Sequence, residues 1–238
     1  GEVPLSNDTS FGAGFYPISR MEKNIIDIEK LLNSSLAKNK HPFIGEDIKV
    51  MGVEMEGKEF FTIAIAIVDR YISDLQDYIS KLKQVKEFVC TQLGLEDALI
   101  QINTADNYKT GSIYLTVTGT SAENGDDGQV GRGNRINGLI TPYHPMSLEA
   151  TSGKNPVSHI GKIYNYFAMD LSRAVVENNL ADYASVFIVS QIGKSIDDPQ
   201  LLNIKLKSSK INQKKVEELA VLWLKKLPDY WKRITGIR

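Results

Sequence analysis

The sequence has little cysteine, no long apolar run and no excess of charge. Its single cysteine, Cys90, excludes an internal disulfide and a cysteine metal cluster, and we expect this thiol to be buried in a helix. No apolar stretch approaches the roughly 20 residues of a membrane-spanning helix. The net charge of −1 argues against broad nucleic-acid binding through phosphate neutralisation. We therefore expect a cytoplasmic protein that binds neither nucleic acid nor a membrane.

Motifs of several common enzyme classes are also missing. No GxxxxGK[ST] segment is present, which excludes a P-loop. The segment GQVGRG at residues 128–133 has neither the spacing nor the strand–turn–helix context of a dinucleotide fingerprint. There is no HExxH motif, and the three histidines (His41, His144 and His159) are scattered, so a histidine-rich metal centre is disfavoured. Nothing like GxSxG supports a serine-hydrolase triad.

Apolar periodicity predicts helices that alternate with pairs of strands. The expected helices are residues 20–33, 69–92, 157–179 and 212–226, and the expected strands are residues 47–56, 59–68, 98–103, 112–118, 183–192 and 201–207. Ser19 and Glu22 form a capping box before the first helix, and Gly57-Lys58 indicates a hairpin. Residues 1–17 are expected to be a loop. Paired strands with long helices indicate an α+β fold, with helices covering one face of a sheet.

The order of elements is similar on the two sides of residue 120. We therefore expect two related α+β units: a central domain at residues 1–119 and a C-terminal domain at residues 120–238, which carries a glycine-rich active-site loop. The chain opens at Gly1 with a turn-rich segment. We expect it to be a piece of a longer protein.

The glycine-rich stretch at residues 118–162 is the most informative part of the sequence. Loops longer than about 12–15 residues are usually functional or disordered, and apolar anchors such as Leu139 argue against disorder. Arg132 and Arg135 can each present a guanidinium fork to phosphate oxygens. Lys154 adds a point charge just before a helix N-terminus, where the helix dipole favours an anion.

Two carboxylates, Asp126 and Asp127, lie between the glycines of this stretch. They can orient a cationic or hydroxyl group, or hold Mg²⁺ directly or through water. The residue types together predict a site for a polyanion. The alternative on residue types alone is a solvated, charged loop held by Asp–Arg pairs of little energetic value.

Five sequence blocks carry a family resemblance. The central block, residues 119–165, is GTSAENGDDGQVGRGNRINGLITPYHPMSLEATSGKNPVSHIGKIYN. The others are LSNDTSFG at residues 5–12, GEDIKVMG at residues 45–52, INTADN at residues 102–107 and SQIGKSIDDP at residues 190–199. With these blocks, nearly the whole chain resembles the archaeal-type S-adenosylmethionine synthetases (methionine adenosyltransferases). The N-terminal region of that family, with its His-Pro-Asp motif and a further glycine-rich ATP motif, is absent.

The resemblance implies a fold, a reaction and partners. The implied fold has three α+β domains related by pseudo-threefold symmetry, in a homodimer with active sites between subunits. The implied enzyme, a transferase, forms S-adenosylmethionine from ATP and L-methionine, and then hydrolyses the released tripolyphosphate to phosphate and diphosphate. Mg²⁺ is implied as a cofactor, and K⁺ as an assisting ion. The alternative is a non-catalytic, truncated paralogue that binds ATP or polyphosphate, as a regulatory subunit would.

The resemblance also implies site residues, although it assigns no metal ligand. The implied catalytic residues are Asp126, Arg132, Lys154 and His159, and the implied substrate-binding residues are Asn7, Asp8, Asp127, Asn134, Arg135, Asn155, Lys162 and Ile192.

Overall fold

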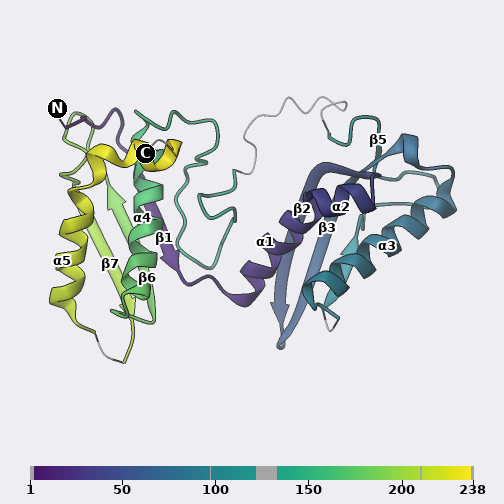
Figure 1. Cartoon of the computed structure of the whole chain (residues 1–238), viewed down its shortest axis with the longest axis horizontal. Helices are drawn as coiled ribbons and strands as arrows, with labels where there is room; N and C mark the ends of the chain where they lie inside the picture. Colours follow the sequence, from purple (N-terminus) through teal and green to yellow (C-terminus); the bar gives the residue numbers. More distant parts are fainter. Residues whose placement is uncertain (1–2, 97, 122–132, 210, 237–238) are drawn as a thin grey trace. The chain divides into compact units, whose positions relative to one another are not determined.

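A computed structural model describes residues 3–96, 98–121, 133–209 and 211–236 of the chain. The chain forms two compact units. Unit 1 combines Gly1–Ile18 with Val130–Arg238, and unit 2 is Ser19–Gln129. In each unit helices lie on one face of a β-sheet (Figure 1). The mixed helix and sheet composition confirms the α+β class.

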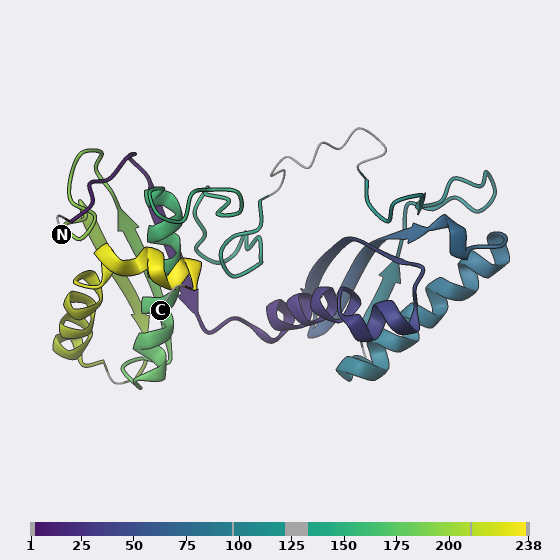
Figure 2. The same ribbon diagram turned by 45° about the horizontal axis from the view of Figure 1, so that its top comes forward.

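Unit 1 is built on a three-stranded antiparallel sheet of order β1–β6–β7. Its elements are β1 (Phe11–Tyr16), α4 (Ile160–Glu177), β6 (Tyr183–Val189), β7 (Leu201–Lys207), α5 (Gln213–Leu224), η3 (Leu227–Asp229) and α6 (Tyr230–Thr235). The core lies between the sheet and α4, α5 and α6, and includes Tyr164 and Phe167. Helix α6 crosses α4, where the Tyr230 hydroxyl donates to Asp170 at 2.7 Å (Figure 2).

The pairing of strand β1 places the N-terminal residues in unit 1. The sequence predicts a loop in the first domain for residues 1–17, whereas the structure pairs Phe11–Tyr16 with β6, so that Phe11 lies opposite Val189. Gly12 allows close packing on α4, because a Cβ added there would lie 2.2 Å from the Tyr164 carbonyl oxygen. Residues 1–18 therefore belong with the C-terminal part of the chain. The predicted boundary between residues 119 and 120 places them in the first domain instead.

Asn165 connects three segments of unit 1 from a fully buried position. Its Oδ1 accepts hydrogen bonds from the Ala13 backbone N–H at 3.1 Å and from Ser147 Oγ at 2.8 Å. Its Nδ2 donates to the Gly161 carbonyl oxygen at 2.7 Å. These bonds satisfy a buried amide and fix β1 and the loop that contains Ser147 against the start of α4.

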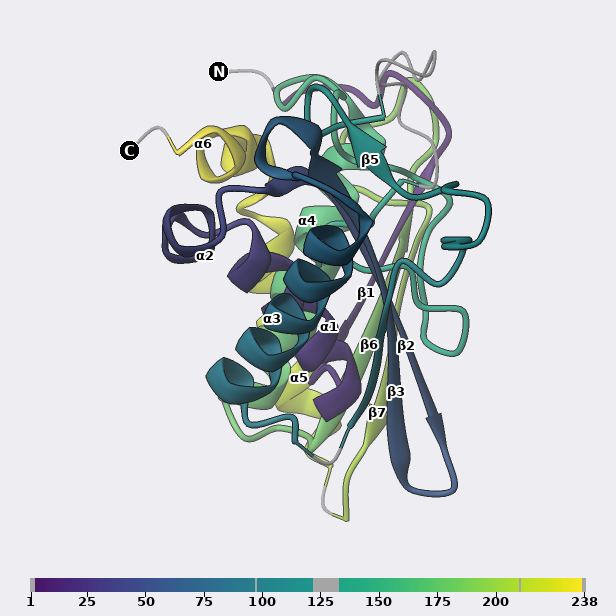
Figure 3. The ribbon, with the colours of Figure 1, turned by 90° about the vertical axis from the view of Figure 1, so that its right-hand side faces the viewer.

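Unit 2 has β3 at the centre of its sheet, with β2 antiparallel to it and β4 and β5 parallel to it. Its elements are α1 (Arg20–Leu32), α2 (Ser35–Lys40), β2 (Ile44–Met55), β3 (Lys58–Val68), η1 (Asp69–Tyr71), α3 (Leu75–Leu93), β4 (Leu99–Ile102) and β5 (Leu115–Thr116). Helices α1 and α3 lie on the same side of β2 and β3 (Figure 3). The predicted capping box is confirmed, because Ser19 and Glu22 exchange side-chain to backbone bonds of 3.1 and 2.7 Å.

Three local predictions for unit 2 need correction. The two-residue hairpin loop is Glu56-Gly57 rather than Gly57-Lys58: both residues have positive φ, 52° and 73°, and Met55 pairs with Lys58. Positive φ at both central residues is typical of a type I′ turn. The predicted elements leave residues 34–46 unassigned, whereas the structure has the short helix α2 there, with Ser34 as its N-cap. Cys90 is partly rather than fully buried, and this burial raises the pKa of its thiol.

None of the helices in the described ranges combines the length and the apolar character that crossing a membrane demands.

Candidate functional site

The first turn of α4 brings distant segments of unit 1 together. His159 is the N-cap, and its Nδ1 accepts a hydrogen bond from the Gly161 backbone N–H at 3.1 Å. Asn7 comes from the N-terminal segment, and its Oδ1 accepts from the Ile160 N–H at 3.1 Å. Side chains therefore already occupy these two amide groups of the turn. An anion bound here would be held by side-chain cations in addition to the helix dipole.

Glu149 lies against this turn and links it to Lys154. One carboxylate oxygen of Glu149 accepts from Ser10 Oγ at 2.7 Å, and the other pairs with Lys154 Nζ at 2.9 Å. Gly161 makes the approach possible, because a Cβ added there would lie 2.8 Å from the carboxylate. The side chains of Glu149 and Lys154 are 21% and 29% exposed. The ammonium group of Lys154 is thus held in a partly buried ion pair at the edge of the site.

The pKa of Glu149 reflects two opposing effects. Burial acts to raise this pKa, but hydrogen bonds from Lys154 and Ser10, together with the charge of Lys154, lower it further than burial raises it. The net pKa lies below the ordinary glutamate value of about 4.3. Glu149 is therefore ionised at neutral pH and forms an ion pair with the ammonium group of Lys154.

Acidification is expected to remove the stabilisation that Glu149 gives unit 1. Because the folded-state pKa is lower than the unfolded-state pKa, this stabilisation is complete well above about pH 4.3 and is lost as the pH falls through the folded-state value. Urea titrations of the wild type and Glu149→Gln between about pH 6 and pH 3 test this. Their free energies of unfolding should converge on acidification. A constant difference would contradict the role of the ionised carboxylate.

Lys162 and Asn155 shape the turn that carries Lys154. Lys162 Nζ donates to the Lys154 carbonyl oxygen at 3.0 Å. Asn155 Oδ1 accepts from the backbone N–H groups of Val157 at 2.8 Å and Ser158 at 3.3 Å, as in an Asx turn. The structure therefore brings the predicted residues Lys154, Asn155 and Lys162 together just before and within the start of α4.

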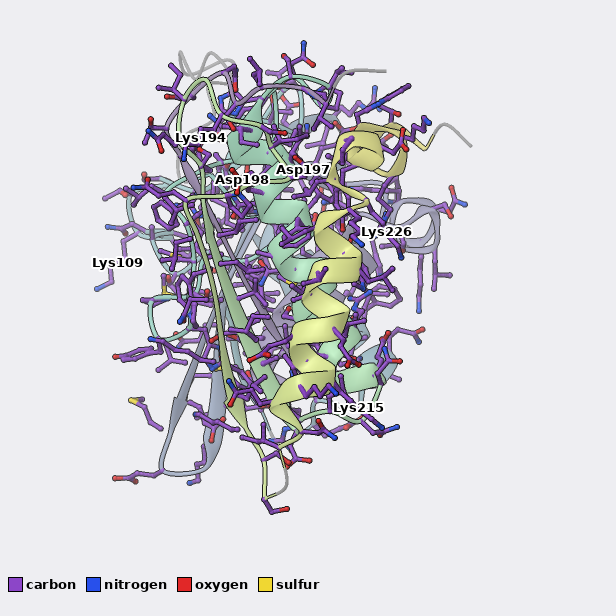
Figure 4. The ribbon with its side chains drawn as sticks, turned by 90° about the vertical axis from the view of Figure 1, so that its left-hand side faces the viewer. Lys109, Lys194, Asp197, Asp198, Lys215 and Lys226 are labelled. Atoms are coloured by element: carbon purple, nitrogen blue, oxygen red, sulfur yellow. The ribbon has the colours of Figure 1, made fainter. Side chains whose placement is uncertain are left out.

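The turn after β6 closes another side of the cluster. Ser190 Oγ accepts from the Ser10 N–H at 2.8 Å and lies 2.9 Å from the Asp8 carbonyl oxygen, to which it can donate. The Ile192 N–H also donates to Thr9 Oγ1 at 3.4 Å, so the segments that carry the predicted residues Asp8 and Ile192 are in contact. Ile192 is 61% exposed. Figure 4 shows Lys194, Asp197 and Asp198 at this end of the unit, while Lys215 lies near the start of α5 and Lys226 lies just past its end.

The remaining predicted residues of the central loop are either outside the described residues or point elsewhere. Asp126, Asp127 and Arg132 lie outside the described residues. Asn134 is exposed on its loop. Arg135 donates from Nη1 to the carbonyl oxygen of Gly133, so its guanidinium group folds back on its own loop.

Metal ligands do not gather in the described part of the chain. No group of three or more His, Cys, Asp or Glu side chains there could hold a metal ion. The residues described do not by themselves fit a Mg²⁺ site.

Sequence reasoning missed Glu149, Ser10 and Ser190 as parts of the site. Glu149 is separated from Lys154 by only four residues, but no motif distinguishes it from other acids of the loop. Ser10 and Ser190 are 180 positions apart, and only the pairing of β1 with β6 makes them neighbours.

Comparison with solved structures supports the class of fold. The chain is similar in fold to an S-adenosylmethionine synthetase described as unusual, from Campylobacter jejuni, with a TM-score of 0.60. The likeness covers 97% of this chain and 61% of that one, at 15% sequence identity.

Sequence comparison defines the family. The family model for S-adenosylmethionine synthetase matches residues 1–236. The chain is 50% identical over 240 residues to a probable S-adenosylmethionine synthase of Aquifex aeolicus, and 47% identical over 242 residues to an S-adenosylmethionine synthase of Methanocaldococcus jannaschii. Each match covers 98% of this chain and 60% of the relative. The chain belongs to the S-adenosylmethionine synthetase family, and it spans about 60% of the length of these curated relatives.

Proposed function

We propose that the protein carrying this chain is a methionine adenosyltransferase. It forms S-adenosylmethionine from ATP and L-methionine, releases tripolyphosphate, and hydrolyses this to phosphate and diphosphate. The observation that carries the proposal is 50% identity to a probable S-adenosylmethionine synthase across 98% of the chain. The names of the relatives favour this enzyme over a non-catalytic, polyphosphate-binding paralogue.

The proposed reaction places specific demands on the site. The methionine sulfur attacks C5′ of ATP, a carbon–sulfur bond forms, and the bond from C5′ to the triphosphate oxygen breaks with its electron pair. The sulfur becomes a sulfonium centre, and no proton has to be removed from it. The barrier falls when sulfur and C5′ are held in line and when positive groups stabilise the charge on the departing oxygen.

The cluster at α4 offers groups suited to the polyphosphate. Lys154 supplies an ammonium group whose position is fixed by Glu149. Lys162, in the first turn of α4, adds a second positive charge. His159 accepts at Nδ1, so the neutral imidazole carries its proton on Nε2 and can donate there. In this proposal Arg132, Asp126 and Asp127 complete the site from the glycine-rich loop.

In this proposal the remaining predicted residues also contact the substrates. Asn7, Asp8 and Ile192 line the side of the cluster formed by the N-terminal segment and the turn after β6. Asn134, Arg135 and Asn155 would contact substrate from the central loop. Mg²⁺ and K⁺ remain part of the proposal as ions that offset the charge of tripolyphosphate.

An exposed apolar sheet face supports a homodimer as part of the proposal. On β2 the side chains of Met51, Val53 and Met55 point away from the helices, and Leu99 on β4 joins them. Such a face is typical of an interaction surface. We propose that it packs in a homodimer of three-domain subunits with active sites between them, to which this chain supplies the second and third domains.

The direct test is an assay of the complete protein that contains this chain. Incubation with ATP, L-methionine, Mg²⁺ and K⁺ should yield S-adenosylmethionine, phosphate and diphosphate, detected by chromatography. Omission of L-methionine is the control, and it should abolish the sulfonium product. A folded protein that binds tripolyphosphate but forms no product would overturn the proposal in favour of the non-catalytic alternative.

A further inference from the structure

Three of the sequence blocks that carry the family resemblance meet in unit 2 at Tyr114, which lies outside all of them. Asp47 belongs to the block at residues 45–52, and Ser121 belongs to the block at residues 119–165. Tyr114 Oη and Ser121 Oγ each lie 2.6 Å from Asp47 Oδ2, and they lie 2.7 Å from one another. Each hydroxyl group can donate to the carboxylate. Tyr114 therefore joins β2 to the start of the glycine-rich loop.

A β-bulge on β2 presents Asp47 to these hydroxyl groups. The register of β2 against β3 shifts between Ile44 and Ile48, so that three residues of β2 lie opposite one residue of β3. Within this bulge the backbone N–H groups of Glu46 and Asp47 donate to the Gly119 carbonyl oxygen at 2.8 and 3.1 Å. Bulges are frequent next to active sites, where they redirect a side chain. Here the bulge binds the backbone of the loop, while the Asp47 carboxylate binds a hydroxyl group two residues further along.

Asp106, from the block at residues 102–107, fixes Tyr114 from the core of the unit. Its Oδ1 accepts from the Tyr114 backbone N–H at 2.9 Å, and its Oδ2 accepts from the Tyr78 hydroxyl at 2.7 Å. Tyr78 is fully buried, and Asn103 Nδ2 donates to its hydroxyl oxygen at 2.9 Å. A continuous series of hydrogen bonds thus runs from buried residues of unit 2 to the loop. Networks of this kind make the groups that they join more rigid.

The carboxylate at the centre of this arrangement is ionised at neutral pH. Burial acts to raise the pKa of Asp47, but hydrogen bonds from Lys49 and from the two hydroxyl groups outweigh burial, so the pKa lies below its ordinary value. Lys49 Nζ donates to both carboxylate oxygens, at 2.6 and 2.5 Å. Hydrogen bonds to a charged acceptor are about twice as strong as those between neutral groups. The bonds from the two hydroxyl groups to Asp47 therefore hold the loop more firmly than neutral contacts would.

We propose that Tyr114 is a positioning residue for the polyphosphate site. Its hydroxyl group ties Ser121 to Asp47, and it thereby fixes the point at which the glycine-rich loop leaves the sheet of unit 2. Arg132, which the proposed function places at the polyphosphate, follows Ser121 in the same loop. Fixing one end of a loop removes conformational freedom that ligand binding would otherwise have to remove, so the affinity rises. The inference rests on the polyphosphate site of the proposed function, but not on the transfer of the adenosyl group.

The test measures the binding of MgATP to the complete protein that contains this chain. Isothermal titration is done without L-methionine, so that no transfer takes place. Tyr114→Phe should raise the Kd of MgATP about tenfold, because it removes a charge-assisted hydrogen bond that orders the loop. Tyr71→Phe is the matched control in unit 2. The Tyr71 hydroxyl accepts from the exposed guanidinium group of Arg70, and its removal should leave the Kd unchanged.

Two variants of Ser121 separate positioning from simple stability. Ser121→Ala should weaken MgATP binding as Tyr114→Phe does, whereas Ser121→Thr, which retains the hydroxyl group, should bind like the wild type. The double variant Tyr114→Phe/Ser121→Ala should lose less binding free energy than the sum of the two single losses, because both hydroxyl groups serve the same tie.

The outcomes distinguish this proposal from the proposed function. An unchanged Kd in folded Tyr114→Phe, with only a lower urea midpoint of unfolding, would leave Tyr114 with a purely structural role and overturn the inference. A raised Kd in Tyr114→Phe, in a protein that forms no S-adenosylmethionine, would support the positioning role and overturn only the adenosyl transfer.

Discussion

A Gly12→Ala variant is expected to lose most of the stability of unit 1. An alanine Cβ at this position would lie 2.2 Å from the carbonyl oxygen of Tyr164 and 2.8 Å from the backbone nitrogen of Asn165. Both atoms belong to the backbone of α4, so no flexible side chain can move aside. Overpacking of this kind costs about 3 kcal/mol or more, because strand and helix must separate.

Tryptophan fluorescence follows this loss selectively. The two tryptophans of the sequence, Trp223 and Trp231, are both in unit 1, so urea unfolding followed at their emission reports on that unit. Gly138→Ala is the matched control: it has φ of 85° and no atom within 4 Å of an added Cβ. Backbone strain alone should cost about 1–2 kcal/mol there. A smaller loss in Gly12→Ala than in Gly138→Ala would contradict the close packing of β1 on α4.

The second large effect concerns polyphosphate binding. Lys154→Ala should weaken the binding of tripolyphosphate, measured by isothermal titration in the presence of Mg²⁺, by about 10–100-fold. The variant removes one positive charge and also leaves the partly buried carboxylate of Glu149 without its ion-pair partner. That unpaired negative charge then repels the polyanion.

Two further variants serve as controls for this prediction. The double variant Lys154→Ala/Glu149→Gln should recover part of the lost affinity, because it removes the repelling carboxylate. Lys215→Ala changes a lysine on α5 of the same unit and should leave the affinity unchanged. If Lys154→Ala bound tripolyphosphate as tightly as the wild type, Lys154 would have no place in the polyphosphate site.

Regular elements could be predicted from the sequence where local signals agree. Strand β7 has the predicted bounds, 201–207, because polar and apolar residues alternate along it. Helix α3 was predicted to begin at residue 69, but it begins at Leu75, where Asp74 accepts from the Asp77 N–H. Residues 69–71 instead form a 3₁₀ turn. Apolar periodicity thus identified the helix, while the capping residue determined its start.

Strand β1 and the place of Glu149 in the candidate site could not be predicted from such local signals. The segment FGAGFY has no alternation of polar and apolar residues, since both of its faces are covered, and its partner β6 is remote in the sequence. The position of Lys154 before a helix predicts its part in the site, whereas His159 is implied only by the family resemblance. The role of Glu149 depends on its contact with Ser10, a tertiary contact that no spacing rule contains.

The interrupted sequence of unit 1 has a consequence for synthesis on the ribosome. Unit 2 is complete in the chain by residue 129, whereas β1 has left the ribosome long before β6 is made. At roughly 5–20 residues per second, β1 waits on the order of ten seconds or more for its partner strand. Unit 2 can fold in that interval, with β1 as an unpaired edge that chaperones must protect. A chain released before residue 189 would leave β1 permanently without its full partner, which makes premature termination in this region an expected cause of aggregation.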